Sequence, residues 1–167
     1  MKGYAARLKP LMLRRPRLTL AVAESLTAGH LQAQIASVSG ASEYFLGGLT
    51  AYSLGQKVKL LGVNRAHARR VNCVSQRVAV EMAYGAMERF GADLAAATTG
   101  YAEPSRAAGI KEPMAWWAIC QRLPNGRLAI NSGTIEAPGA NRLEAQERIA
   151  QDVLGLLVAH VDAWREE

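Results

Sequence analysis

The sequence predicts an α/β fold with three layers, α/β/α, in which a mixed, mostly parallel sheet of about five strands lies between helices on both faces. Short apolar runs of strand length alternate with segments whose apolar residues recur at helical spacing, which is typical of parallel sheets with crossover helices. Two later runs flank a P-N-G turn and predict an antiparallel hairpin. Half of the 167 residues are apolar, enough to fill one core, so residues 1–167 are expected to form a single domain.

In the first half of the chain, the predicted strands cover residues 19–23 and 45–53, and the predicted helices cover residues 3–13, 27–38 and 56–61. Leu31 and Ile35 lie four residues apart, which puts both on one helical face. Gly47 and Gly48 interrupt the second strand and mark a bulge or a close backbone approach. Gly62 ends the third helix. The first strand and the helix after it therefore form a strand–turn–helix unit.

The second half of the chain begins with a helix that follows Ser75, a good N-cap residue, and ends at Gly91. The predicted strands then cover residues 92–100, 114–123 and 127–137, with an irregular loop at 100–112. Asn125 and Gly126 both tolerate positive φ, which suits a hairpin turn. A final helix begins near Asn141. Its expected buried face consists of Ile149, Val153, Leu157, Val161 and Trp164.

The chain carries a formal net charge of +6, and its basic residues include a cluster formed by Arg65, Arg69 and Arg70. A basic balance of this kind can indicate a polyanionic partner. Aromatic residues make up only 6% of the chain, no nucleic-acid-binding motif surrounds the arginines, and a charge cluster is ordinarily a solvated face. Nucleic acid is therefore not expected as a partner.

Neither a membrane span nor a disulfide or metal framework is expected. The best candidate span, residues 18–23, is cut off by Glu24 and falls well short of the roughly 20 apolar residues that cross a bilayer. The same interruption argues against an export signal. Cys73 and Cys120 have neither disulfide nor metal-ligand spacing. The expectation is a cytoplasmic protein with reduced thiols and no metal.

Polar residues follow three of the predicted strands at the point where each strand ends. These residues are Glu24, Ser25 and Thr27 after the first strand, Tyr52, Ser53 and Lys57 after the second, and Thr98, Thr99 and Gly100 at the end of the third. Ligands of α/β proteins bind beyond the carboxyl ends of parallel strands, so a hydroxyl, an amine and an anion-binding backbone are expected to converge there.

Each of these residues also has a purely structural interpretation. Ser25 or Thr27 can cap the following helix. Lys57 can be an ordinary exposed lysine, and Thr98 and Thr99 are acceptable strand residues. Periodicity and composition therefore locate a candidate site without identifying its reaction.

Four segments occur in order along the chain: AESLTAGHL, GASEYFLGGLTAYSLGQKVKLLGV, VSQRVAVEMAYGAMERFGADLAAATTGYAEP and APGANR. In sequence and spacing they resemble the C-terminal domain of the competence/damage-inducible protein CinA, a family that includes stand-alone nicotinamide mononucleotide deamidases. The resemblance extends from residue 18 to the final helix. It implies an amidohydrolase that uses a serine and a lysine, with no metal or other cofactor, and a homodimer or larger assembly.

By position in the family pattern, the resemblance implies that Ser25 is the nucleophile and that Lys57, 32 residues later, is its base. A lysine can take the serine proton only if burial lowers its pKa from about 10.4 toward neutrality. Ser42 is implied as a proton relay. The residues implied to bind the nucleotide substrate are Tyr52, Thr99, Arg142 and Thr27, the last through backbone N–H groups that hold the oxyanion. The implied reaction converts nicotinamide mononucleotide to nicotinic acid mononucleotide and ammonia.

Several residues depart from the family pattern on the ligand side. Leu26 and Ala28 replace a cysteine and a glycine beside the serine, and Glu103 replaces a glycine at a point where it is expected to repel a phosphate. Trp116 and Trp117 are expected to narrow the pocket. Two hypotheses stay open: a working amidohydrolase with an altered substrate, or a catalytically silent relative that binds a small molecule or a protein partner.

Overall fold

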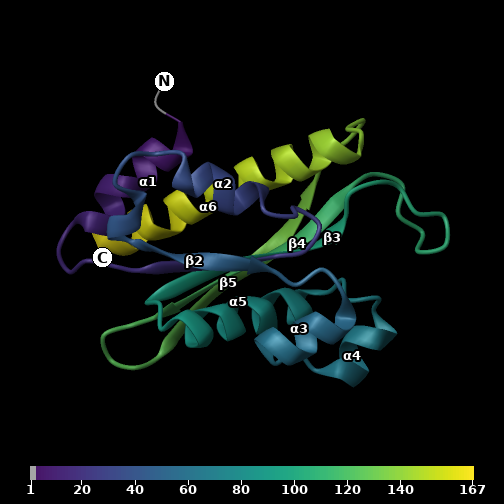
Figure 1. Cartoon of the computed structure of the whole chain (residues 1–167), viewed down its shortest axis with the longest axis horizontal. Helices are drawn as coiled ribbons and strands as arrows, with labels where there is room; N and C mark the ends of the chain where they lie inside the picture. Colours follow the sequence, from purple (N-terminus) through teal and green to yellow (C-terminus); the bar gives the residue numbers. More distant parts are fainter. Residues whose placement is uncertain (1–2) are drawn as a thin grey trace.

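The computed structural model describes residues 3–167 and contains a five-stranded sheet with helices on both sides (Figure 1). The strands are β1 (Leu20–Glu24), β2 (Phe45–Thr50), β3 (Leu94–Tyr101), β4 (Met114–Arg122) and β5 (Leu128–Glu136). The α-helices are α1 (Tyr4–Leu13), α2 (His30–Ala36), α3 (Leu54–Leu61), α4 (Arg65–Arg70), α5 (Gln76–Phe90) and α6 (Arg142–Glu166), and a short 3₁₀-helix, η1 (Ala41–Glu43), precedes β2.

The strand order is β2-β1-β3-β4-β5, and the sheet is mixed. β1 pairs in parallel with both β2 and β3, whereas β4 pairs antiparallel with β3 and β5. This confirms the predicted α/β class and the predicted hairpin. Of the two residues expected to make its turn, only Gly126 has positive φ (80°), because the connection is a longer loop closed by a hydrogen bond from the Leu123 N–H to the Arg127 carbonyl (2.8 Å). The carboxyl ends of β1, β2 and β3 lie at one edge of the sheet.

Two helical layers cover the sheet: α1, α2 and α6 lie on one face, and α3, α4 and α5 lie on the other (Figure 1). Alternate residues of each strand enter opposite cores. Leu20 and Val22 of β1 pack with α1, α2 and α6, whereas Ala21 and Ala23 pack with α5. The small side chains on the second face let α5 lie close to the strands.

The two glycines of β2 meet the sequence prediction. The register between β1 and β2 shifts at Leu20, so that Leu20 pairs with Phe45 but the next residue pairs with Gly47, which is a bulge. A Cβ added at Gly48 would lie 2.8 Å from side-chain atoms of Gln32 in α2. Both the bulge and the close approach are therefore present.

Three elements differ from the sequence expectations. The helix expected over residues 27–38 begins only at His30, because Ala28 (φ 48°) and Gly29 (φ 96°) turn the chain through left-handed conformations. The second strand ends at Thr50, and Ser53 instead caps α3 by accepting a hydrogen bond from the Gln56 N–H. The sequence does not predict α4, whose six residues are too few to show a helical period. Trp164 of α6 is half-buried, not buried.

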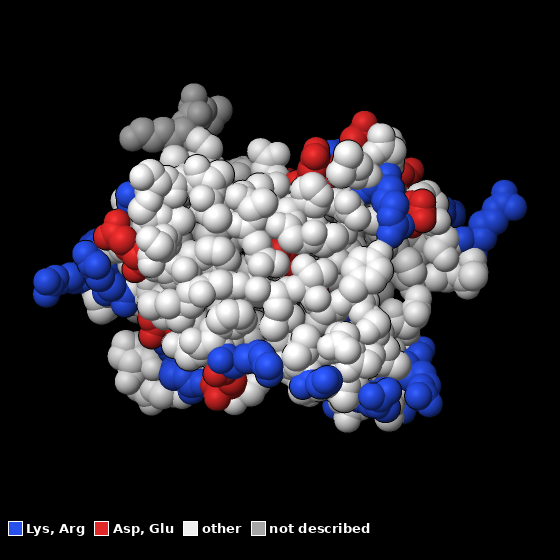
Figure 2. All heavy atoms as spheres, in the orientation of Figure 1, with Lys and Arg blue, Asp and Glu red and all other residues white. Residues whose placement is uncertain are grey.

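The basic cluster of the sequence lies on α4, where Arg65, Arg69 and Arg70 are all exposed. Figure 2 shows lysine and arginine side chains over the region of α3 and α4. None of the helices formed by residues 3–167 has the length and apolar character required to cross a bilayer.

Replacing Ala28 by glycine is expected to raise the free energy of unfolding by about 0.5–1 kcal/mol, because the left-handed backbone strains a residue with a Cβ and the added flexibility of glycine offsets part of the gain. The matched control is Ala33→Gly, which removes a methyl group from the exposed side of α2. This substitution should lower the free energy of unfolding by about 1 kcal/mol. Urea unfolding measures both. A lower free energy of unfolding for Ala28→Gly than for the wild type would contradict the inference that the backbone of Ala28 is strained.

Candidate active site

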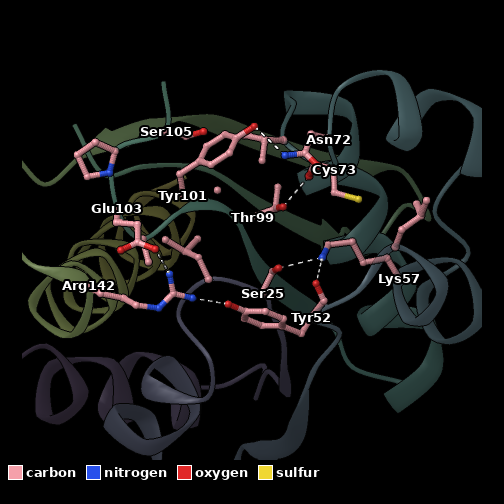
Figure 3. A pocket seen from close by; sticks show the side chains of 16 residues that line it. Ser25, Tyr52, Lys57, Asn72, Cys73, Thr99, Tyr101, Glu103, Ser105 and Arg142 are labelled. Carbon is pink, nitrogen blue, oxygen red and sulfur yellow. Dashed lines mark hydrogen bonds and ion pairs between the residues drawn. The ribbon is translucent and has the colours of Figure 1, made fainter. Parts of the chain in front are cut away.

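A cavity of about 470 Å³ opens at the carboxyl edge of the three parallel strands (Figure 3). Its walls come from the turn after β1, the segment between β2 and α3, the loop between α4 and α5, the end of β3 with the loop beyond it, and the first residue of α6. This is where ligands bind in α/β proteins. Elements far apart in the sequence therefore meet at one concave site.

Ser25 and Lys57 meet at the base of this cavity. The Lys57 Nζ lies 2.9 Å from the Ser25 Oγ, and it also donates hydrogen bonds to the backbone carbonyls of Ala51 (2.8 Å) and Tyr52 (3.0 Å). The exposed fraction is 1% for Lys57 and 7% for Ser25. The interpretation of Lys57 as an ordinary exposed lysine is therefore wrong.

Burial lowers the pKa of Lys57, since a low-dielectric surrounding disfavours the ammonium form. The nearby Cys73 thiol opposes this shift when it is ionised. Within residues 3–167 no carboxylate forms an ion pair with Lys57. A neutral amine has two N–H donors and one lone pair. In the ammonium form the three contacts match its three donors, whereas in the neutral form the two carbonyls match the donors and the lone pair is left for the Ser25 hydroxyl hydrogen.

The carboxylate that precedes Ser25, that of Glu24, caps helix α2. The Glu24 side chain is fully buried, and its two oxygens accept hydrogen bonds from the N–H groups of Leu31 (2.8 Å) and Gln32 (3.0 Å) in the first turn of α2. The N-cap residue of this helix, Gly29, makes no side-chain hydrogen bond. Glu24 therefore does the work of a capping side chain, and the hypothesis that Ser25 caps the helix is wrong.

Thr27 is fully buried and does not line the cavity. Its hydroxyl lies 2.7 Å from the hydroxyl of Thr98, which ties the turn after β1 to β3. Thr27 neither caps α2 nor begins it, because the helix starts three residues later. Its side chain therefore holds the turn that carries Ser25 and does not contact the cavity.

Three residues implied to bind substrate do line the cavity: Tyr52, Thr99 and Arg142. Arg142, at the start of α6, donates from Nη2 to the Tyr52 hydroxyl (2.6 Å) and from Nη1 to the carboxylate of Glu103 (2.9 Å). Thr99 is buried and donates to the backbone carbonyl of Cys73 (2.6 Å). Figure 3 shows Lys57 on one side of Ser25 and the Arg142–Tyr52 pair on the other.

Ser42 does not join these residues. It is exposed in η1, before the amino end of β2, whereas the cavity lies beyond the carboxyl end of that strand. The hydroxyl expected to relay a proton is therefore outside the cavity. Counting residues along the chain does not reveal at which end of a strand a residue lies.

Trp116 and Trp117 do not narrow the cavity, contrary to the sequence expectation. They are consecutive residues of β4, so their side chains enter opposite layers. Trp117 is buried in the core beside α6, and Trp116 packs against the core beside α5. Both indole rings therefore pack in the hydrophobic layers that cover the two faces of the sheet.

Sequence reasoning missed the contribution of the loop between α4 and α5. Asn72 (φ 50°) and Cys73 (φ 62°) both have left-handed backbones and both line the cavity. The Asn72 side-chain amide donates to the hydroxyl of Tyr101 across the cavity (3.1 Å). Asparagine tolerates this conformation, which gave a weak signal of a turn; cysteine gave none. Within residues 3–167 no group of three His, Cys, Asp or Glu side chains is placed to hold a metal ion.

The two cysteines are expected to differ in reactivity. Cys120 is fully buried and burial raises its pKa to about 11, whereas Cys73 is half-buried and lines the cavity. Because the thiolate is the reacting species, a disulfide reagent should label Cys73 in the native protein and Cys120 only after unfolding. Mass spectrometry of labelled peptides distinguishes them. Equal labelling of both thiols in the native protein would contradict the burial of Cys120.

Together the fold and the cavity define a class of protein: a three-layer α/β domain with a buried serine–lysine pair at the carboxyl edge of its parallel strands. The family model described as the CinA C-terminal domain matches residues 5–161. The chain belongs to that family.

Among curated relatives, the chain is 40% identical over 145 residues to a CinA-like protein of Chlorobium limicola, covering 86% of this chain and 33% of that protein. It is 40% identical over 150 residues to one of Chlorobaculum tepidum, covering 89% and 35%. The chain thus spans about a third of the length of these relatives.

Among solved structures, a CinA superfamily protein of Klebsiella pneumoniae has a TM-score of 0.86 at 23% identity, covering 96% of this chain and 97% of that one. A CinA superfamily protein of Escherichia coli has a TM-score of 0.79 at 26% identity, covering 93% and 87%. The first likeness establishes the shared fold.

Proposed function

We propose that this chain is a serine–lysine amidohydrolase that converts nicotinamide mononucleotide to nicotinic acid mononucleotide and ammonia. The observation that carries the proposal is the 2.9 Å contact between the Lys57 Nζ and the Ser25 Oγ. The buried amine also donates hydrogen bonds to the backbone carbonyls of Ala51 and Tyr52. An amine whose pKa is lowered by burial and that lies within hydrogen-bond reach of a hydroxyl can act as its base.

In the proposed reaction, the Ser25 Oγ attacks the carboxamide carbon as its proton passes to the Lys57 Nζ. The tetrahedral intermediate collapses with cleavage of the C–N bond, and the leaving nitrogen takes that proton from Lys57 and departs as ammonia. Water then attacks the acyl group on Ser25, with Lys57 again accepting the proton. Release of the acid restores the Ser25 hydroxyl and the neutral amine.

One backbone N–H group beside Ser25, that of Leu26, suits the developing oxyanion. In the turn after β1, the N–H of Ala28 bonds to the Ser25 carbonyl and the N–H of His30 bonds to the Thr27 carbonyl. Within residues 3–167 the N–H of Leu26 has no such acceptor, and Leu26 lines the cavity. A donor next to the nucleophile, fixed before the reaction, stabilises the charge without reorganisation.

The direct test is ammonia release from nicotinamide mononucleotide by the wild-type protein and by a Ser25→Ala control. Turnover in the wild type alone supports the proposal. No release above that of the control, with the ligand shown to bind, would count decisively against this substrate.

The second candidate function is that of a silent relative that binds a ligand without turnover. The observation that favours it is the occupation of Arg142 by Glu103 and Tyr52, which ties up the groups expected to hold a substrate. Under this alternative, a Glu103→Gly, Ala28→Gly double variant stays inactive. Recovered hydrolysis in the double variant would instead mean that the mechanism is intact and the recognition groups are altered.

A further inference from the structure

We propose that Glu103 is a specificity-determining residue that disfavours amide substrates carrying a phosphate next to Arg142 and favours the corresponding substrate with a free hydroxyl there. This inference rests on the proposed serine–lysine amidohydrolase function, and it shifts the preferred substrate from the mononucleotide to the corresponding nucleoside. Its basis is the pairing of the charged side chains that line the cavity.

The charged residues that line the cavity are Lys57, Glu103 and Arg142. Lys57 is 1% exposed, burial lowers its pKa, and in the proposed mechanism it acts as the neutral base, so it is not assigned to the phosphate. Arg142 is the remaining cation, and its Nη1 is 2.9 Å from the Glu103 carboxylate. The cavity walls thus present a neutralised pair where a phosphate needs an unpaired cation.

Both terminal nitrogens of Arg142 are engaged, one by Glu103 and the other by the Tyr52 hydroxyl. These contacts use two of the five N–H donors of the guanidinium, so a phosphate placed end-on across both terminal nitrogens competes with both partners. Glu103 is 61% exposed and Arg142 48% exposed, so the ion pair itself is weak and separable. Glu103 therefore does not block the guanidinium permanently.

The carboxylate nevertheless stays close after the pair opens. Glu103 is followed by Pro104, which restricts the backbone of the preceding residue to extended conformations. A phosphate bound to Arg142 then lies within about one side-chain length of a second negative charge, and the repulsion between them lowers affinity by about tenfold in a solvated site.

A hydroxyl group suits the same pair. It accepts a hydrogen bond from the Arg142 guanidinium and donates one to the Glu103 carboxylate, so the ion pair is bridged and not broken. The cavity therefore matches a nicotinamide nucleoside better than the nucleotide. Both share the carboxamide that Ser25 attacks.

The first experiment uses inorganic phosphate as the probe and does not depend on turnover. Wild type, Glu103→Gln and the control Glu88→Gln are titrated with phosphate, and backbone amide NMR shifts around Arg142 report binding. Glu88 forms a comparable exposed ion pair with Arg122 and does not line the cavity. We expect phosphate to bind about tenfold more tightly to Glu103→Gln than to the other two proteins. Equal affinities, or no binding to any of them, would overturn the inference.

The second experiment measures kcat/KM for nicotinamide mononucleotide and for the corresponding nucleoside. Wild type should prefer the nucleoside, and Glu103→Gln should shift the ratio about tenfold toward the mononucleotide, mainly through KM. An unchanged ratio overturns the inference. If the phosphate titration succeeds and neither amide is hydrolysed by either protein, the assignment of Glu103 stands and the proposed function fails.

Discussion

Ser25→Ala is expected to lower the rate of amide hydrolysis by at least about 10³-fold, because the substitution removes the attacking oxygen. The fold should survive, since Lys57 keeps its hydrogen bonds to the carbonyls of Ala51 and Tyr52. Ammonia release gives kcat and KM, and circular dichroism checks the fold.

The matched control is Ser42→Ala, which removes a hydroxyl of the same kind from an exposed position in η1 outside the cavity. Its kcat/KM should stay within about twofold of wild type, as for a surface substitution away from the site. Comparable losses in both variants would mean that Ser42 reaches a reaction centre, and retained activity in Ser25→Ala would exclude Ser25 as the nucleophile.

Lys57→Met is expected to cost about 10²–10⁴-fold in kcat, the usual contribution of a general base. In the wild type, kcat/KM should rise with pH as Lys57 loses its proton and then level off. Since burial lowers this pKa from 10.5, the rise should come well below the pH at which a free lysine titrates. Activity that falls as the pH rises through that range would contradict a lysine base.

The same amine links stability to pH. Between the lowered pKa of folded Lys57 and its ordinary value of 10.5, the unfolded chain binds a proton that the folded chain does not. The free energy of unfolding therefore rises with pH across this window, and the contribution is constant outside it. Urea unfolding of wild type and Lys57→Met at matched pH values isolates the contribution of Lys57. The free energy of unfolding of the wild type should increase relative to that of Lys57→Met as the pH rises. If the free energy of unfolding of the wild type instead decreased relative to that of Lys57→Met, the folded protein would favour the charged form of Lys57.

Strong local signals made much of the fold predictable. The final helix follows from the capping box formed by Asn141 and Glu144, and α5 from Ser75 and Gly91 at its two ends. The left-handed turn at Ala28 escaped prediction because alanine gives no sign of positive φ. Short α4 escaped because six residues show no period.

The site was predictable where strand order alone decides it. Ser25, Tyr52 and Lys57 follow parallel strands and Thr99 lies near the end of β3, so the sheet brings them to one edge. Long-range pairings carry no such sequence signal: the Glu103–Arg142 ion pair joins residues 39 positions apart, and Ser42 lies at the opposite end of β2 from Lys57. Alternation along β4 sends Trp116 and Trp117 to opposite faces of the sheet, so the sequence already argued against both rings lining one cavity.

Two of the three atoms that hold the Lys57 amine belong to peptide groups, those of Ala51 and Tyr52. A peptide oxygen is present whatever side chain its residue bears, so mutation at position 52 can change the aromatic group that lines the cavity and leave both carbonyl contacts of the amine in place. Substitutions at position 52 can therefore change the wall of the cavity while the main chain keeps two of the contacts that hold the Lys57 amine.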